Sequence, residues 1–189
     1  MRYNWQQKDW PKFSFDIQKV EDLLYTYAEK AGRLSGTLDA MSDEAQTEAL
    51  VNTLVAEAIK TSEIEGEYLS REDVASSIRN NLGILNQTEE IKDIRAKGIA
   101  DLMLNVRNSY KDNLTEDTLF TWHRMLLSHD TAIALGSWRT HEEPMQVISG
   151  AIGREVVHFE APPSDKVPEE MQSFIKWFNK ISPKEEKAI

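Results

Sequence analysis

The sequence predicts a mainly α-helical protein with one β-hairpin. Apolar residues recur three and four positions apart along most of the chain, which is the period of an amphipathic helix, and capping residues precede several of these stretches. The pattern changes only at residues 144–160, where β-branched residues flank a glycine turn. The chain has 189 residues, of which 40% are hydrophobic and 29% charged, so it is expected to be globular rather than disordered.

The composition excludes several functional classes. The chain contains no cysteine, which rules out disulfides, thiolate zinc sites and cysteine nucleophiles and is consistent with the cytoplasm. Its net charge of −10 disfavours nucleic acid as a partner, because that binding depends on cations that neutralise phosphates. No run approaches the roughly 20 apolar residues of a membrane span, and the N-terminus does not resemble a signal peptide. We therefore expect a cytoplasmic protein that binds neither nucleic acid nor membrane.

An aromatic-rich arm and a first helix are expected at the N-terminus. The arm, residues 1–15, is predicted to be extended and to pack on the helices. The helix is predicted to begin at Asp16, and Gly32 and Gly36 are expected to end it. Its apolar face is formed by Ile17, Val20, Leu24, Tyr27 and Ala31.

The second helix carries the most distinctive segment of the sequence. It is predicted to begin at Ser42, a good N-cap, and to end at Gly66, which suits a left-handed C-cap. Its stripe is formed by Leu54, Ala58, Thr61 and Glu65. A carboxylate that extends an apolar stripe must reach a partner or bear a desolvation cost. The alternative is that Glu65 simply emerges into solvent where the helix ends.

Three further helices are expected before the hairpin. The third begins with Ser70 and Asp73 in capping-box spacing and ends near Gly83. The fourth is predicted to begin at Thr88 and the fifth at Thr115. This fifth helix is rich in leucine and tryptophan, and it fits a homodimer interface as well as a core position.

The hairpin is expected at about residues 145–159. Val147 and Ile148 precede a turn at Gly150–Gly153, and Val156 follows it. These three β-branched residues are the candidate strand positions.

Two helices are expected after the hairpin. In the sixth, Pro168 suits the first helical position, and the buried face is predicted to contain Met171, Phe174, Ile175 and Phe178. Ser182, Pro183 and Glu185 predict the start of a seventh helix. The sequence continues only to Ile189, short of the roughly 12–15 residues that an isolated helix needs. We therefore expect a fold that is incomplete at its C-terminal end.

Residue chemistry alone predicts no active site. The sequence has no phosphate-binding glycine loop, nucleophile elbow or dinucleotide fingerprint, and no pair of carboxylates stands out as acid and base. No metal site is predicted, because the i, i+4 spacing of a helical metal site is missing from the four histidines, His123, His129, His141 and His158.

Five segments resemble members of the Fic family and follow one another in that family's order. Residues 61–66 (TSEIEG) match its inhibitory motif, in which Ser or Thr is followed after three residues by Glu and then Gly or Asn. Residues 3–13 resemble a small N-terminal domain found on bacterial Fic proteins, and residues 119–123 resemble the start of the Fic core. Residues 136–139 (GSWR) resemble the Gly-x-x-Arg entry to the family's flap, and residues 159–177 the stretch that leads to its catalytic helices.

The resemblance implies a Fic-like helical bundle in two parts. Residues 1–85 would form an N-terminal helical domain that includes the inhibitory helix, and residues 86–189 a partial Fic core with the flap at about 145–159. The family's catalytic motif, which begins His-Pro-Phe and continues through Gly-Asn-Gly-Arg to a second arginine, is absent from the sequence. No residue of this chain is therefore assigned a catalytic role.

The resemblance also implies a chemistry and a mode of inhibition. Fic proteins transfer AMP from ATP to a hydroxyl of a target protein, and the motif histidine removes the hydroxyl proton. Glu65, presented by Thr61 and Gly66, would pair with the motif's second arginine in the place that the γ-phosphate needs. ATP and Mg²⁺ are expected in the intact enzyme, and neither is expected to bind this chain tightly.

Two functions remain open. In the first, the chain is the regulatory and target-docking portion of a self-inhibited AMP-transferase, and Val147, Ile148 and Val156 pair with an extended segment of a protein target. An ordinary structural hairpin is the alternative for the flap. In the second, the chain is a stand-alone, antitoxin-like protein that inhibits a separate Fic core. A helical DNA-binding regulator is disfavoured by the acidic balance.

Overall fold

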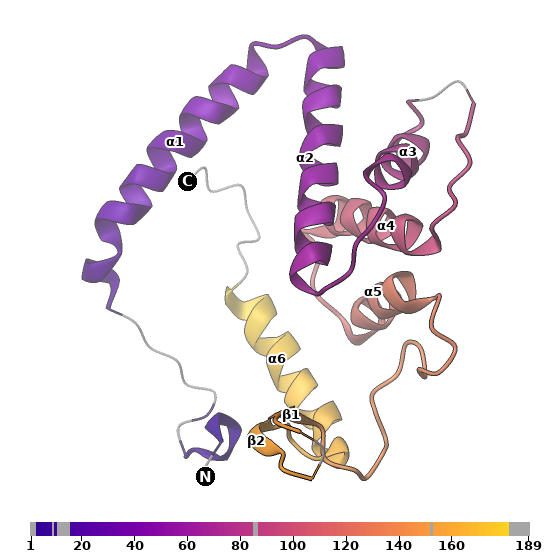
Figure 1. Ribbon diagram of the computed structural model, residues 1–189. Coiled ribbons are helices and arrows are strands. Elements are labelled where there is room, and N and C mark those ends of the chain that lie inside the picture. Colours follow the sequence, from indigo (N-terminus) through magenta and orange to yellow (C-terminus); the bar gives the residue numbers. More distant parts are fainter. Residues whose placement is uncertain (1–2, 9, 11–15, 85–86, 152, 182–189) are drawn as a thin grey trace.

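The computed structural model describes residues 3–8, 10, 16–84, 87–151 and 153–181. Within these ranges the chain is mainly helical with one two-stranded sheet, which confirms the predicted fold class (Figure 1). None of the described helices combines the length and apolarity needed to cross a bilayer. The elements are η1 (Asn4–Gln6), η2 (Ile17–Lys19), α1 (Glu21–Asp39), α2 (Asp43–Ile64), α3 (Arg71–Leu82), α4 (Ile94–Ser109), α5 (Glu116–Leu127), β1 (Gln146–Ser149), β2 (Val156–Glu160), η3 (Ser164–Lys166) and α6 (Val167–Ile181).

The hydrophobic core lies where α2, α3 and α4 pack together, and α5 packs on the far side of α4. This core contains residues from both sides of position 85. The division of the chain into two parts at that position stays a prediction. Its buried members are Val51, Val55 and Ala58 from α2, Val74 and Ile78 from α3, and Ala96, Ile99 and Ala100 from α4.

Helix α1 stands apart from this core and is joined to it through α2 (Figure 1). None of its residues is buried, so its predicted apolar face has no cover within the described part of the chain. The expectation that Gly32 and Gly36 end the helix is wrong, because α1 continues to Asp39. Glycine in a helix interior costs only roughly 0.5–1 kcal/mol relative to alanine, which is too little to stop a helix of this length.

Three of the predicted helix starts are confirmed. The hydroxyls of Ser42, Ser70 and Thr115 each accept a hydrogen bond from the backbone amide three residues further on, at 3.1–3.3 Å. Such caps satisfy donors that the first turn of a helix leaves unpaired, which is why these local signals could be found in the sequence. Gly83 ends α3 in the left-handed conformation, with φ of 67°, as predicted.

The predicted start of α4 at Thr88 is wrong, because the helix begins at Ile94. The preceding segment is instead tied to α3. The amide of Glu89 donates to the Oδ1 of Asn80 at 3.0 Å, and the Nδ2 of Asn80 donates to the carbonyl of Glu89 at 2.8 Å. The hydroxyl of Ser76 also donates to the Glu89 carboxylate. These contacts hold the segment away from helical geometry.

The predicted hairpin is confirmed, and the N-terminal arm packs partly on it. The indole of Trp5 donates to the carbonyl of Glu160 at 2.6 Å, and the ring of Tyr3 lies edge-on to that of Phe159, with centroids 5.6 Å apart. Trp10 donates to Glu170 of α6 at 3.3 Å. The arm residues 11–15 lie outside the described residues, as does the seventh helix predicted from Ser182.

Helix α6 is attached through one side chain to the loop between α4 and α5. The side-chain Oδ1 of Asn179 accepts from the backbone N–H of Leu114, and its Nδ2 donates to the Leu114 carbonyl, each at 2.8 Å. The predicted buried face is wrong in part: Met171 and Ile175 are half-buried, but Phe174 and Phe178 are exposed. Phe174 is 38% and Phe178 37% exposed, and the two rings lie with their centroids 6.0 Å apart.

Two glycine-to-alanine substitutions are expected to have opposite effects on stability. A Cβ at Gly98 of α4 would overlap the backbone carbonyl of Met125 in α5, so Gly98→Ala forces the two helices apart and should destabilise by about 1–3 kcal/mol. A Cβ at Gly32 of α1 meets nothing within 4 Å, so Gly32→Ala should stabilise by about 0.5–1 kcal/mol. Urea titration measures both. Equal effects of the same sign would contradict the close α4–α5 packing.

Candidate functional site

The C-terminal end of α2 is a rigid turn that presents Glu65. The amide of Glu67 donates to the carbonyl of Ser62 at 2.8 Å, and that of Gly66 to the carbonyl of Glu63 at 3.1 Å. These two bonds form a Schellman motif, which requires a left-handed residue after the helix. Gly66 fills that position with φ of 81°, so its predicted role as a left-handed cap is confirmed.

The buried face of α2 differs from the predicted stripe. It consists of Val51, Val55, Ala58 and Ser62. Thr61 and Glu65 are both exposed, and the hydroxyl of Thr61 donates to the carboxylate of Glu57 at 3.3 Å. Glu65 follows Ala58 by two turns, but it lies beyond the point where α3 and α4 cover the helix. It therefore bears no desolvation cost in this chain.

The Glu65 carboxylate is left without a charge partner. Within the described ranges, no hydrogen bond or ion pair is made by its side chain. A negative charge at a helix C-terminus is disfavoured by about 0.3–1 kcal/mol, because the macrodipole is negative there. Nearby apolar side chains are also exposed, Ile64 at 83% and Tyr68 at 77%. This carboxylate, flanked by open apolar surface, is available to a cation from outside the described structure.

An ion-pair network anchors the loop that follows Gly66. The guanidinium of Arg95, in the first turn of α4, contacts the Glu67 carboxylate at 2.6 Å. The same guanidinium forks onto Asp93, with Nε to Oδ1 at 3.1 Å and Nη2 to Oδ2 at 2.8 Å. The amide of Asp93 in turn donates to Asp73 of α3 at 3.2 Å. We call Glu67, Arg95 and Asp93 the Arg95 clasp. No motif or spacing in the sequence predicts this group.

Asp93 of the clasp is expected to stay ionised in mild acid. Hydrogen bonds from the Arg95 side chain lower the pKa of Asp93, although burial acts against them, and the Asp93 side chain raises the pKa of Arg95. A carboxylate with a depressed pKa stabilises the fold above its unfolded-state pKa of about 3.9, and the contribution is lost as pH falls through the folded value. Protonation of Asp93 therefore opens the clasp only in more acidic solution than an ordinary aspartate requires.

The candidate docking residues of the flap are accessible. Val147, Ile148 and Val156 are each more than half exposed. In the turn between the strands, the amide of Gly153 donates to Glu155 at 2.7 Å, and this bond lowers the pKa of that carboxyl. The flap therefore presents apolar side chains close to Gly153 and Glu155, which this bond joins.

Among the described residues, no strand pairs with the outer edge of β1. The carbonyl of Met145 accepts from the amide of Ala161 at 2.9 Å, so the Gln146 amide, in the same peptide unit as that carbonyl, points away from β2. The opposite edge is partly occupied, because the Glu160 carbonyl points outward and accepts from Trp5. An extended segment could therefore be added beside β1, which is continuous; the register shift opposite Val147 and Ile148 comes from an extra residue, His158, in β2.

Arg139, from the GSWR segment, anchors the base of the flap. Its guanidinium donates to the carbonyl of Pro162 and, at 3.3 Å, to the hydroxyl of Ser164, and it lies 3.7 Å from the sulfur of Met145. Gly136 opens this segment with φ of 65°. The arginine thus ties the residues before β1 to those after β2.

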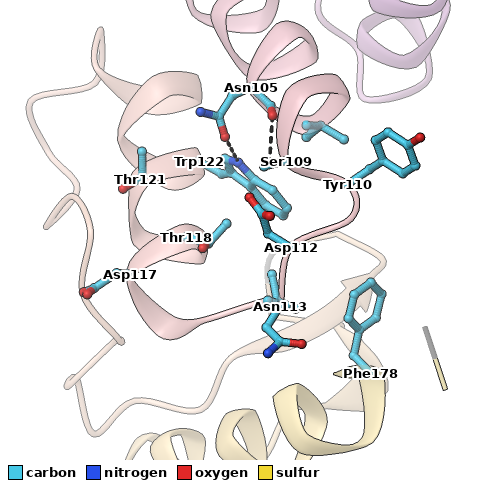
Figure 2. Close-up of a pocket in the computed structure, with 12 residues that line it drawn as sticks. Asn105, Ser109, Tyr110, Asp112, Asn113, Asp117, Thr118, Thr121, Trp122 and Phe178 are labelled. Carbon is cyan, nitrogen blue, oxygen red and sulfur yellow. Dashed lines mark hydrogen bonds between the residues drawn. The ribbon is translucent and has the colours of Figure 1, made fainter. Parts of the chain in front are cut away.

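An open pocket of about 430 Å³ lies between the C-terminal part of α4, α5 and the end of α6 (Figure 2). The Trp122 indole lies in the wall formed by α4 and α5 and donates to the Oδ1 of Asn105 at 2.7 Å. Phe178 lines the pocket from α6. Asp112 and Asp117 are in its lining, which contains no Lys, Arg or His. Two carboxylates without a cation would repel a phosphate, so this pocket does not favour a nucleotide.

The described residues contain no group of three or more His, Asp or Glu side chains positioned to hold a metal ion. His123 accepts from the amide of Gly136 at 3.0 Å, and His158 lies 2.6 Å from the hydroxyl of Ser149. These two histidines therefore have ordinary structural partners.

Comparison with known proteins gives one match. Residues 3–84 match the model of a family described as "Domain of unknown function (DUF4172)". The match begins in the N-terminal arm, contains α1, α2 and α3, and includes the Glu65 turn. No curated protein matches the chain.

Proposed function

We propose that this chain is the N-terminal regulatory and target-docking portion of a self-inhibited protein AMP-transferase of the Fic type. Such an enzyme transfers AMP from ATP to a hydroxyl of a target protein in the cytoplasm. Glu65 is the inhibitory carboxylate, and Thr61 and Gly66 shape the end of the helix that presents it. The flap residues Val147 and Ile148 on β1, with Val156 on β2, dock the target.

The main support is the state of Glu65. Its backbone is held by the Schellman turn, and its carboxylate has no partner among the described residues. An arginine brought to this position would form a charge-assisted pair, which is worth about 1.5–3 kcal/mol. A glutamate that merely ended the helix would gain nothing from this placement.

The second support is the amount of open surface. Among the described residues, large apolar side chains are exposed on two helices: Leu23, Tyr25 and Leu34 of α1 at 68%, 69% and 61%, and Trp177 of α6 at 49%. Such open apolar faces suit a chain that packs against a further protein body, as a catalytic core would provide.

The nucleotide and its metal would be held by that core. The pocket beside Trp122 carries two carboxylates and no basic residue, and Arg139 is engaged by the base of the flap. ATP and Mg²⁺ would supply the transferred AMP and neutralise the phosphates. The residues of this chain regulate access to that chemistry and align the target.

The proposal is tested by comparing a Fic catalytic core alone with the same core joined to this chain. Labelled ATP and a protein substrate report AMP transfer. The joined protein is expected to transfer AMP at least tenfold more slowly than the core, because the Glu65 pair blocks the productive ATP pose. Equal rates would reject the regulatory role.

The alternative, a stand-alone inhibitor, is favoured by one observation, namely that the surface around Glu65 is open enough for a contact between two chains. Adding this chain to the core as a separate protein tests it. Saturable inhibition would support the alternative, whereas inhibition seen only when the two are joined would support the first function.

A further inference from the structure

We propose that Arg95 is the positioning residue for Glu65, which it controls from another helix through Glu67. This inference rests on the proposed inhibitory function. Arg95 belongs to the first turn of α4, about 30 positions after the glutamate that it would control. Arg95 does not touch Glu65. It acts by fixing the backbone that follows Glu65.

The geometry makes Glu67 the critical point of attachment. Glu65 is followed by Gly66, the residue type with the greatest backbone freedom, so the direction of the carboxylate depends on what holds the chain after the glycine. The amide of Glu67 closes the Schellman turn onto Ser62 at 2.8 Å, and its side chain is held by Arg95 at 2.6 Å. The two contacts of Glu67 therefore join the turn at the end of α2 to α4.

Arginine suits this role because one planar group serves two carboxylates. Two of its nitrogens fork onto Asp93, which fixes the plane of the guanidinium, and the third meets Glu67. The backbone of Asp93 is itself held by the hydrogen bond that its amide donates to the carboxylate of Asp73 in α3. The guanidinium is thus oriented by the core helices before it contacts the loop. A lysine would keep the positive charge but could not donate from two fixed nitrogens to the two oxygens of Asp93.

The clasp is expected to order the loop rather than to stabilise the whole fold. Arg95 is 38% and Glu67 53% exposed, and ion pairs with that exposure contribute little to global stability. Loss of the clasp should therefore speed local opening of the turn while leaving the core of α2, α3 and α4 intact. This difference separates a positioning role from a general structural one.

Lys60 provides a matched control at the same helix end. Its ammonium pairs with Glu63 at 2.7 Å, a distance close to that of the Arg95–Glu67 pair. The Lys60 pair lies wholly within α2 and does not reach the loop after Gly66. Lys60→Met and Arg95→Met thus each remove one cation, but within the described ranges Lys60 pairs only with Glu63, whereas Arg95 pairs with both Glu67 and Asp93, so only the second variant releases Glu67.

The first measurement is amide hydrogen exchange on this chain. In Arg95→Met, the amides of Gly66 and Glu67 are expected to exchange about tenfold faster, in line with the roughly 1.4 kcal/mol that a tenfold change represents. Arg95→Lys should give an intermediate rate, and Lys60→Met an unchanged one. The thermal midpoint of Arg95→Met should fall by less than about 4 °C. Unchanged exchange at both amides would overturn the inference.

The second measurement is AMP transfer by the chain joined to a Fic catalytic core. Arg95→Met is expected to raise the rate several-fold, Arg95→Lys to restore part of the inhibition, and Lys60→Met to have no effect. If Glu65→Gly raises transfer and Arg95→Met does not, the positioning role is wrong and the proposed function stands. If neither variant raises transfer, the proposed function itself fails, and the positioning role, which depends on it, fails with it.

Discussion

Replacing Glu65 by glycine is expected to raise AMP transfer about 10- to 150-fold in a protein that joins this chain to a Fic catalytic core. The reason is the loss of a charge-assisted pair worth about 1.5–3 kcal/mol, with a tenfold change for every 1.4 kcal/mol. Glu65 ends α2 as its C-cap and makes no described side-chain contact, so the substitution disturbs little else. Labelling of a protein substrate from ATP measures the effect.

Two glutamine variants sharpen this prediction. Glu65→Gln removes the charge and keeps the shape, so it should release most of the inhibition. Glu63→Gln is the matched control, because Glu63 lies in the same helical turn but already pairs with Lys60 within α2. The inhibitory assignment would have to be abandoned if both glutamine variants released inhibition equally, or if neither Glu65 variant increased labelling.

Proline at Ile148 is expected to reduce modification of a protein target tenfold or more while leaving ATP binding nearly unchanged. Ile148 pairs with Val157, next to His158, the residue of β2 that the register leaves without a partner in β1, and proline would remove the Ile148 amide and disturb β1. The two strands pack mainly on each other and not on α2, α3 or α4, so the helical core should be unaffected. The measurement compares the rate of target labelling with the affinity for ATP.

Ile148→Thr is the control for the flap. It retains the backbone amide and a β-branched side chain, so docking through main-chain hydrogen bonds should survive. Equal losses of target labelling and of ATP binding in Ile148→Pro would count against a docking role and favour an ordinary structural hairpin.

The features that the sequence predicted correctly are those decided over a few residues. Ser42, Ser70 and Thr115 cap helices because a hydroxyl reaches an amide three residues away, and this requires no knowledge of the rest of the chain. Gly66 and Gly83 end α2 and α3 because the left-handed conformation favours glycine. The hairpin was predicted for the same reason, from β-branched residues on either side of a turn.

The errors arose where tertiary contacts decide the structure. Thr88 resembles a helix start, but the hydrogen bonds between Asn80 and Glu89 hold that segment against α3. Phe174 and Phe178 follow a helical stripe, yet periodicity shows only which residues share a face and not whether anything covers it. The helical period predicts Thr61 on the buried face of α2, whereas the packing of α3 and α4 buries Ser62 instead.

In the candidate site, too, the sequence predicts the features that local residues decide and misses those that tertiary contacts decide. Glu65 and Gly66 could be found because they belong to one short motif. Arg95 carried no signal in the sequence, since its partner Glu67 is 28 positions away and the two meet only when α4 packs beside the end of α2. Arg139 was marked by its motif, but its role in joining Met145 to Pro162 and Ser164 needed the folded chain.

The central claim is that Glu65 pairs with an arginine of a catalytic core, and a crystal structure of the joined protein without nucleotide tests it most directly. The account predicts that an oxygen of the Glu65 carboxylate lies about 2.7–2.9 Å from a guanidinium nitrogen of the second arginine in the catalytic motif. A Glu65 side chain that points into solvent, or that pairs with a residue outside that motif, would contradict it.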